Sequence, residues 1–139
     1  MPYTVDWYLP ERIMRIQLSE ELTIADAEQL SNISPTYINQ GTAPVHVLID
    51  ALTVEKYPTQ IAQLSKVVKS KVDLAHLGWV IYATRSPLLK FVFSTVTQIA
   101  MPNVRLRVYE TLDEALAFLV DRDVTLVDLL PPPTIAPPR

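Results

Sequence analysis

The residues of this sequence that could do chemistry directly follow two apolar runs. Asp50 comes after the run at 45–49, and Thr84 and Arg85 come after the run at 79–83. Continuous apolar runs of this length are typical of parallel strands, and open sheets of such strands bind ligands at their carboxyl ends. One hypothesis is therefore an enzyme that uses Asp50 and Arg85.

A structural interpretation of the same residues is simpler. An aspartate that follows a strand commonly accepts a hydrogen bond from a backbone amide of the next turn. Arg85 can pair with Asp50 or face solvent, and no acid, base and nucleophile stand at a recognised spacing. We therefore expect no enzyme activity, and we expect Asp50 to hold local loop geometry.

Residue counts exclude several classes of site. The sequence has no cysteine, which excludes disulfides, thiol catalysis and cysteine-ligated metals. Its two histidines, His46 and His76, are too few for a multi-histidine metal site. Its two glycines, Gly41 and Gly78, cannot form a glycine-rich phosphate loop. We expect neither a cofactor nor a metal ion.

Both histidines have structural interpretations. His46 lies inside the apolar run at 45–49, where a hydrogen-bonded core histidine is expected rather than a metal ligand. His76 stands at the end of a predicted helix, where it is expected to interact with the negative end of the helix dipole rather than act as a general base.

The length of the chain predicts a single domain, and its net charge argues against nucleic-acid binding. The chain has 139 residues and a net charge of −3, whereas phosphate binding needs a basic face. Its most apolar stretch, 88–101, is too short and too often interrupted by polar residues to span a bilayer. We expect a single cytoplasmic domain at 1–130. Residues 131–139 contain five prolines and are expected to form a disordered tail.

Hydrophobic periodicity predicts alternating strands and helices. Period-two alternation predicts an antiparallel hairpin from 3–9 and 14–18, and helical spacing predicts a helix after Thr23 that breaks at Ser34, before Pro35. The remaining predicted elements are strands at 45–49, 79–83 and 104–108, and helices at 59–75, 87–101 and from 111. The order β-β-α-β-α-β-α-β-α predicts an α/β fold with about five mainly parallel strands, an antiparallel first strand and about four helices.

One aromatic residue does not fit the apolar face of the predicted helix at 87–101. Phe91 falls on the polar side of this helix, beside Ser94 and Gln98. Either a neighbouring element covers it, or it anchors an interface with a partner protein, since aromatic side chains are enriched in such contacts. We favour a homodimer, because closed two-fold pairs are the commonest assembly.

Several stretches together resemble the STAS superfamily, and within it the small SpoIIAA-like bacterial domains. They are the opening hairpin at 7–18, the strand ending in Asp50, the segment Tyr57-Pro58-Thr59, the segment at 77–80 and the last helix at 111–119. The resemblance covers about residues 3–121 and implies a SpoIIAA-like fold. It also implies a non-catalytic regulatory domain that binds other proteins and resembles anti-sigma-factor antagonists.

The resemblance also points to a surface. It places Tyr57 and Thr59 near Asp50, Thr84 and Arg85, as candidates for a binding rim. Family members carry a phosphoacceptor in Asp-Ser-Ser-Gly, where this chain has Thr59 without the aspartate or the glycine, which argues against the phosphorylation switch. Some relatives of this architecture bind apolar small molecules or lipids, so carriage of such a ligand is the alternative function.

Overall fold

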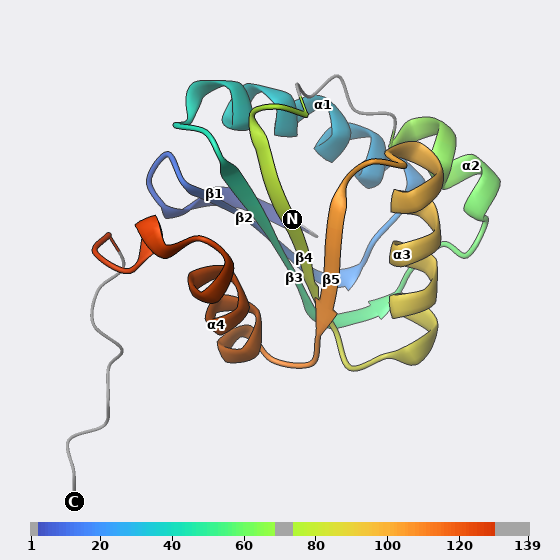
Figure 1. The fold of residues 1–139 in the computed structure, drawn as a ribbon. Coiled ribbons are helices and arrows are strands. Elements are labelled where there is room, and N and C mark those ends of the chain that lie inside the picture. The colour runs from blue at the N-terminus through green and yellow to red at the C-terminus, as the bar shows by residue number, and fades with distance from the viewer. Residues whose placement is uncertain (1–2, 69–73, 130–139) are drawn as a thin grey trace, which may run out of the picture.

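The computed structural model describes residues 3–68 and 74–129 and shows five strands and four helices within them (Figure 1). In chain order they are β1 (Tyr3–Leu9), β2 (Ile13–Glu21), α1 (Ile24–Gln40), β3 (Val45–Lys56), α2 (Ile61–Val67), β4 (Leu77–Ala83), α3 (Pro87–Ala100), β5 (Arg105–Tyr109) and α4 (Leu112–Arg122), followed by the short 3-10 helix η1 (Val124–Leu126). The expected tail at 131–139 and positions 69–73 of the expected second helix lie outside the described residues.

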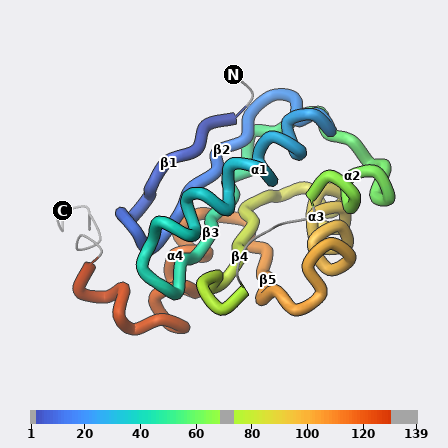
Figure 2. The backbone as a smooth tube through the Cα atoms, turned by 90° about the horizontal axis from the view of Figure 1, so that it is seen from above, coloured from blue at the N-terminus to red at the C-terminus, as the bar shows by residue number. Residues whose placement is uncertain are grey.

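The sheet has the order β1-β2-β3-β4-β5, with β1 antiparallel to β2 and all other pairs parallel, which confirms the predicted fold class. Each parallel strand is added beside the previous one, in one direction across the sheet. Because such crossovers are right-handed, the three crossover helices must lie on the same face. Figures 1 and 2 show α1, α2 and α3 on that face and α4, which follows the last strand, on the other.

Alternation along the strands gives each face its own core. Met14, Ile16 and Val80 point toward α1 and α3 and belong to the larger cluster. Leu48 and Ile81 point toward the other face. There they pack against Leu119 of α4 and Leu126 of η1. The continuous apolar runs in β3 and β4 are therefore explained by helices on both faces.

Three helix starts follow their capping residues. The Thr23 hydroxyl accepts from the Asp26 amide, and the Thr23 amide donates to the Asp26 carboxylate, which completes a capping box. Ser86 caps α3 with Pro87 in its first turn, and Thr111 caps α4. All three starts agree with the sequence prediction, because each cap is a local interaction within about three residues.

The predicted break at Ser34 is wrong, because α1 runs through Pro35 without interruption. The Ser34 hydroxyl donates to the Leu30 carbonyl at 2.7 Å, inside the helix. Leu30 and Ile38, on either side of the proline, are both buried in the larger core. Burial of both turns outweighs the local cost of the proline.

The predicted start of the second helix is also displaced. β3 continues to Lys56, well beyond the apolar run, and α2 begins only at Ile61. The first helical bond is donated by Leu64 to the Gln60 carbonyl, so Gln60 is the N-cap and its side chain makes no capping bond. Thr59 lies one residue too early to cap this helix.

These helix starts predict different effects for two threonine substitutions. Thr111→Ala should lower the free energy of unfolding by about 1 kcal/mol, since it removes the cap of α4. Thr59→Ala changes an exposed residue outside any helix, so it should change the free energy of unfolding by less than about 0.5 kcal/mol. Urea unfolding of the two variants tests this, and equal losses would mean that Thr59 does cap α2.

Candidate functional site

Asp50 holds an irregularity in β3. Its side chain is 8% exposed, and its Oδ1 accepts from the Leu52 amide at 3.1 Å. At this place the register of β2 and β3 shifts between Gln17 and Ser19, so β3 carries an extra residue. The aspartate thus stabilises a bulge in the strand, which confirms the expected role in local backbone geometry.

Tyr57 and Thr84 meet through Ser86. The Thr84 hydroxyl accepts from the Ser86 amide at 3.1 Å, and Ser86 Oγ lies 3.2 Å from the Tyr57 hydroxyl. The same Ser86 oxygen accepts from the Leu89 amide at the start of α3. These three residues therefore join the end of β3, the end of β4 and the first turn of α3.

The structure does not bring Asp50 and Arg85 together. Arg85 is exposed and makes no ion pair within residues 3–68 and 74–129. Thr59 is exposed as well, beyond the end of β3. The predicted rim is thus divided between buried residues that hold the backbone and exposed residues that are free to contact a partner.

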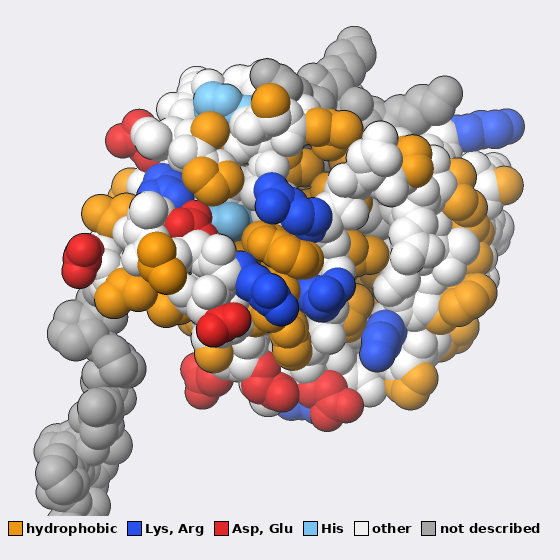
Figure 3. All heavy atoms as spheres, in the orientation of Figure 1, with side chains coloured by type: hydrophobic (Ala, Val, Ile, Leu, Met, Phe, Trp, Pro, Cys, Tyr) orange, Lys and Arg blue, Asp and Glu red, His pale blue; other side chains and the backbone are white. Residues whose placement is uncertain are grey.

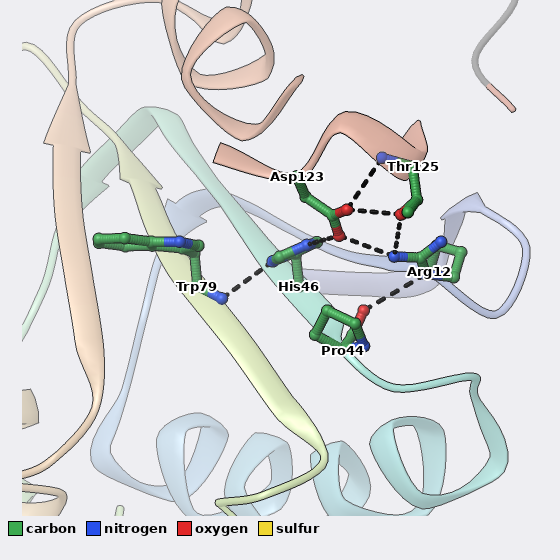
Figure 4. A network of polar contacts seen from close by, with 6 residues as sticks. All are labelled: Arg12, Pro44, His46, Trp79, Asp123 and Thr125. Atoms are coloured by element: carbon green, nitrogen blue, oxygen red, sulfur yellow. Dashed lines mark hydrogen bonds and ion pairs between the residues drawn. The ribbon is translucent and has the colours of Figure 1, made fainter. Parts of the chain in front are cut away.

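A polar network built around the buried Arg12 and His46 lies on the α4 face of the sheet (Figure 4). His46 Nε2 lies 2.8 Å from Asp123 Oδ2, which also accepts from the Arg12 guanidinium at 2.7 Å. Arg12 donates further to the Thr125 hydroxyl and, at 3.4 Å, to the Pro44 carbonyl. Sequence reasoning found His46 but missed Arg12, Asp123 and Thr125.

Both nitrogens of the His46 ring are occupied. Nδ1 accepts from the Trp79 amide at 2.9 Å, so the proton is on Nε2, which donates to Asp123. No nitrogen is left to take a proton from a substrate. The pair resembles the base and orienting acid of a hydrolase, yet its hydrogen bonds make it a structural unit, as expected for a core histidine.

Burial and charge shift both members of this pair. Burial lowers the pKa of His46, and this outweighs the opposing effect of Asp123. Burial alone would raise the pKa of Asp123, but hydrogen bonds from Thr125 and His46 and the charge of Arg12 lower it. A neutral imidazole donating to a carboxylate is therefore the state that the site favours.

His76 also contacts a helix end, although a different one from that predicted. Its Nε2 lies 2.9 Å from the carbonyl of Gly41, the C-cap of α1. The expected interaction with a helix C-terminus is thus made across the fold, to the helix that ends beside the start of β4.

A partly open apolar cavity of about 140 Å³ lies between the sheet and the three crossover helices. Its walls are mainly aliphatic and come from β2, β3, β4, α1, α2 and α3, for example Leu18, Leu30, Val47, Val80 and Val92. A few hydroxyl-bearing residues join them, namely Ser31, Ser34, Tyr57 and Tyr82. The Tyr82 hydroxyl is bonded to Thr97 at 2.8 Å, so the cavity offers few polar groups to an occupant.

The outer face of α3 carries three large exposed apolar side chains. Leu88, Phe91 and Ile99 are 53%, 58% and 58% exposed. Helical spacing places them on one side of α3, and we call these three residues the α3 stripe. No described element covers Phe91, so the interpretation as a residue covered by a neighbouring helix is wrong.

The described part of the chain contains neither a cluster of metal-ligating side chains nor a helix that could span a membrane. Residues 3–68 and 74–129 contain no group of three or more histidine, aspartate or glutamate side chains placed to hold a metal ion. None of the helices described there has the length and apolar character needed to cross a bilayer.

Comparison with known proteins shows the fold. No protein-family model matches the sequence, and no curated protein matches it either. The anti-sigma-factor antagonist SpoIIAA in its unphosphorylated form is similar in structure, with a TM-score of 0.57 and 17% identity over 86% of this chain and 96% of that one.

Two further bacterial structures are also similar. An uncharacterised protein from Shewanella loihica with a SpoIIAA-like fold has a TM-score of 0.57 and 14% identity, over 84% of this chain and 91% of that one. An anti-sigma-factor antagonist from Mycobacterium paratuberculosis has a TM-score of 0.54 and 17% identity, over 87% and 93%. The chain therefore has the SpoIIAA-like fold that its sequence predicts.

The lowered pKa of His46 predicts that acid destabilises the fold. A histidine of the unfolded chain titrates near about 6.5. Between that value and the lower folded pKa the unfolded state binds more protons, so the free energy of unfolding should fall as pH drops below about 6.5. His46→Gln should flatten this dependence between about pH 7.5 and 5, as measured by urea unfolding.

The second histidine supplies the control. His76→Gln should leave the pH dependence of the wild type in place, because His76 lies outside the buried pair. A slope that disappears in His76→Gln and persists in His46→Gln would contradict the assignment.

Proposed function

We propose that this chain is a non-catalytic regulatory module that works by binding another protein, in the first instance a second copy of itself. The observation that carries the proposal is the α3 stripe, whose three apolar side chains are more than half exposed. Large apolar groups gathered on one exposed surface commonly mark an interaction site. The contact would centre on Phe91, since aromatic residues dominate the binding energy of interfaces.

The polar residues support a role without catalysis. Asp50 accepts a hydrogen bond from a backbone amide, and both ring nitrogens of His46 are hydrogen-bonded within the protein. Neither side chain is therefore free to transfer a proton in a reaction. Two of the similar structures are named as anti-sigma-factor antagonists. Their likeness in fold supports a bacterial regulatory role here as well.

The exposed rim residues would extend this surface. Ser86, the cap of α3, contacts Tyr57, which directly follows β3, so Thr59 and Arg85 lie near the start of the same helix. Thr59 lacks the acidic and glycine neighbours of the family phosphoacceptor. We therefore assign Thr59 to the contact surface and not to a phosphorylation switch.

Charge placed in the α3 stripe should disrupt the dimer. Phe91→Glu should give a folded monomer, because a buried carboxylate at an apolar interface is costly. Lys90→Glu places the same side chain on an exposed position of α3 outside the stripe and should remain a dimer. Sedimentation gives the mass of each variant, and thermal melting shows that each one is folded.

Two results would contradict the homodimer. A wild-type chain that sediments as a monomer at high concentration has no such interface. A Phe91→Glu dimer as tight as the wild type would place the contact elsewhere on the surface.

Binding of a small apolar ligand is a second candidate, favoured by the cavity beneath α1 and α3. Its volume of about 140 Å³ is close to that of an engineered apolar cavity, about 150 Å³, that binds benzene. A single ring or a short alkyl chain would fit, whereas a full-length lipid would have to extend beyond the cavity. The scarcity of polar groups on its walls favours a hydrocarbon portion over a charged one.

Filling the cavity should abolish such binding. Ala27 is buried, lines the cavity and lies on α1, so Ala27→Leu should remove the rise in melting temperature that toluene causes in the wild type. Ala25→Leu adds the same side chain at an exposed position of α1 and should keep the rise. No stabilisation of the wild type by toluene, benzene or hexanol would contradict this candidate.

A further inference from the structure

Three arginines stack on two aromatic rings on the face of the sheet that carries α4. Arg105 and Arg107 lie over the Trp79 ring, with guanidinium carbons 5.5 and 5.2 Å from its centroid. Arg122 lies 5.2 Å from the centroid of Phe118, which packs edge-on against Trp79 at 4.8 Å. We call these five residues the arginine patch, and Figure 3 shows this region as apolar side chains flanked by basic ones.

The fold explains why these residues meet. Trp79 of β4 is the register partner of Arg105 of β5, and Arg107 is on the same face because side chains alternate along a strand. Phe118 and Arg122 are four residues apart on α4 and therefore share one side of that helix. Among the described elements, only α4 and η1 cover this face, so the Trp79 ring of β4 is half-buried beneath arginines instead of beneath a second long helix.

The arginines of the patch are largely free of ion pairs. Within residues 3–68 and 74–129, Arg105 and Arg107 form no ion pair, and Arg122 has only the exposed Asp121, at 3.9 Å. Three exposed cations thus gather on a chain whose net charge is −3. A guanidinium stacked on a ring keeps N–H groups at its edge, arranged to bind a carboxylate with two parallel bonds.

We propose that the arginine patch binds an acidic segment of a protein partner, whose carboxylates pair with Arg105 and Arg107 while an apolar side chain packs against Trp79 and Phe118. Tryptophan and arginine are the residue types that contribute most to protein interfaces. The patch lies on the opposite face of the sheet from the α3 stripe, so the proposal does not depend on the homodimer.

Other occupants fit the charges less well. A second copy docked patch to patch would place the arginines of both chains together, and like charges across an interface oppose binding. A nucleic acid would extend its phosphates past the patch, and Figure 3 shows acidic side chains gathered directly below it. The overall charge of −3 also opposes a polyanion, whereas a short acidic segment needs only the patch itself.

Tryptophan fluorescence can report binding at the patch. The chain has two tryptophans, so in a Trp7→Phe background Trp79 becomes the only indole. The probe is a short synthetic peptide that alternates glutamate with leucine, titrated to about 1 mM at low salt. We expect saturable quenching or enhancement of Trp79 emission, and weaker binding as salt is raised, because exposed charges are screened.

Charge reversal supplies the decisive comparison. Arg105→Glu with Arg107→Glu should weaken binding of the peptide at least about tenfold, a loss of about 1.4 kcal/mol. Lys66→Glu with Lys90→Glu makes the same change in net charge at exposed sites on α2 and α3 and should bind as the wild type does. Thermal melts show that each variant is folded, and Arg105→Gln with Arg107→Gln replaces the first pair if it does not fold.

Three results would overturn the proposal. The first is no binding of the acidic peptide by the wild type at about 1 mM. The second is equal loss of binding in the arginine and the lysine variants, which would mean attraction to net charge alone. The third is saturable binding of single-stranded oligothymidine in preference to the peptide, which would assign the patch to nucleic acid.

Discussion

The carboxylate of Asp123 fixes the end of α4 and the short helix η1 against the sheet. It accepts hydrogen bonds from His46 of β3 and from Arg12, which lies between β1 and β2, at 2.8 and 2.7 Å. Arg12 and His46 are 8% and 2% exposed, so loss of the acid would leave the buried cation without its counter-ion and Nε2 of His46 without an acceptor. The interaction joins residues 111 positions apart and fixes the end of α4 against β3 and the hairpin. Leu119 and Leu126, on either side of Asp123, can then be fully buried.

The same network explains why Gly78 must be a glycine. A Cβ atom at position 78 would lie 2.3 Å from Nδ1 of His46, closer than any real contact. The His46 ring therefore rests directly on the backbone of β4, where its Nδ1 reaches the Trp79 amide. Gly41, the other glycine of the chain, is under a similar constraint, since a Cβ there would lie 2.6 Å from the Glu11 carbonyl. Both glycines are required by close approach between segments that are distant in the sequence.

Sequence reasoning succeeded for features that depend on local interactions or on the order of the elements. Thr23, Ser86 and Thr111 start their helices through bonds that reach only about three residues, and the order of elements fixes which face the crossover helices occupy. It failed for features that depend on contacts between segments that are distant in the sequence. Pro35 is tolerated because residues on both sides of it are buried in a distant core, and Thr59 lies outside α2 because β3 continues beside β2 to Lys56. Nothing near Arg12 or Asp123 in the sequence marks either of them as a partner of His46. The apolar surroundings of His46 predict that it needs a hydrogen-bonding partner, but not which one.

The unequal covering of the two faces explains where the surfaces for binding arise. Three crossover helices share one face because of their handedness, and they enclose a cavity where α2 packs between α1 and α3. Within the described residues, the opposite face receives only α4 and η1, which do not cover the whole sheet. Near β1 and β2 the uncovered part carries the ion pair of Arg15 with Asp6, at 2.6 Å. Near β4 and β5 it carries aromatic rings, and arginines shield them where a helix does not. The charges of an ion pair neutralise each other, whereas an arginine stacked on a ring keeps a positive charge with no counter-ion. Of these two uncovered regions, therefore, only the one at β4 and β5 has unpaired charges that can bind an acidic partner.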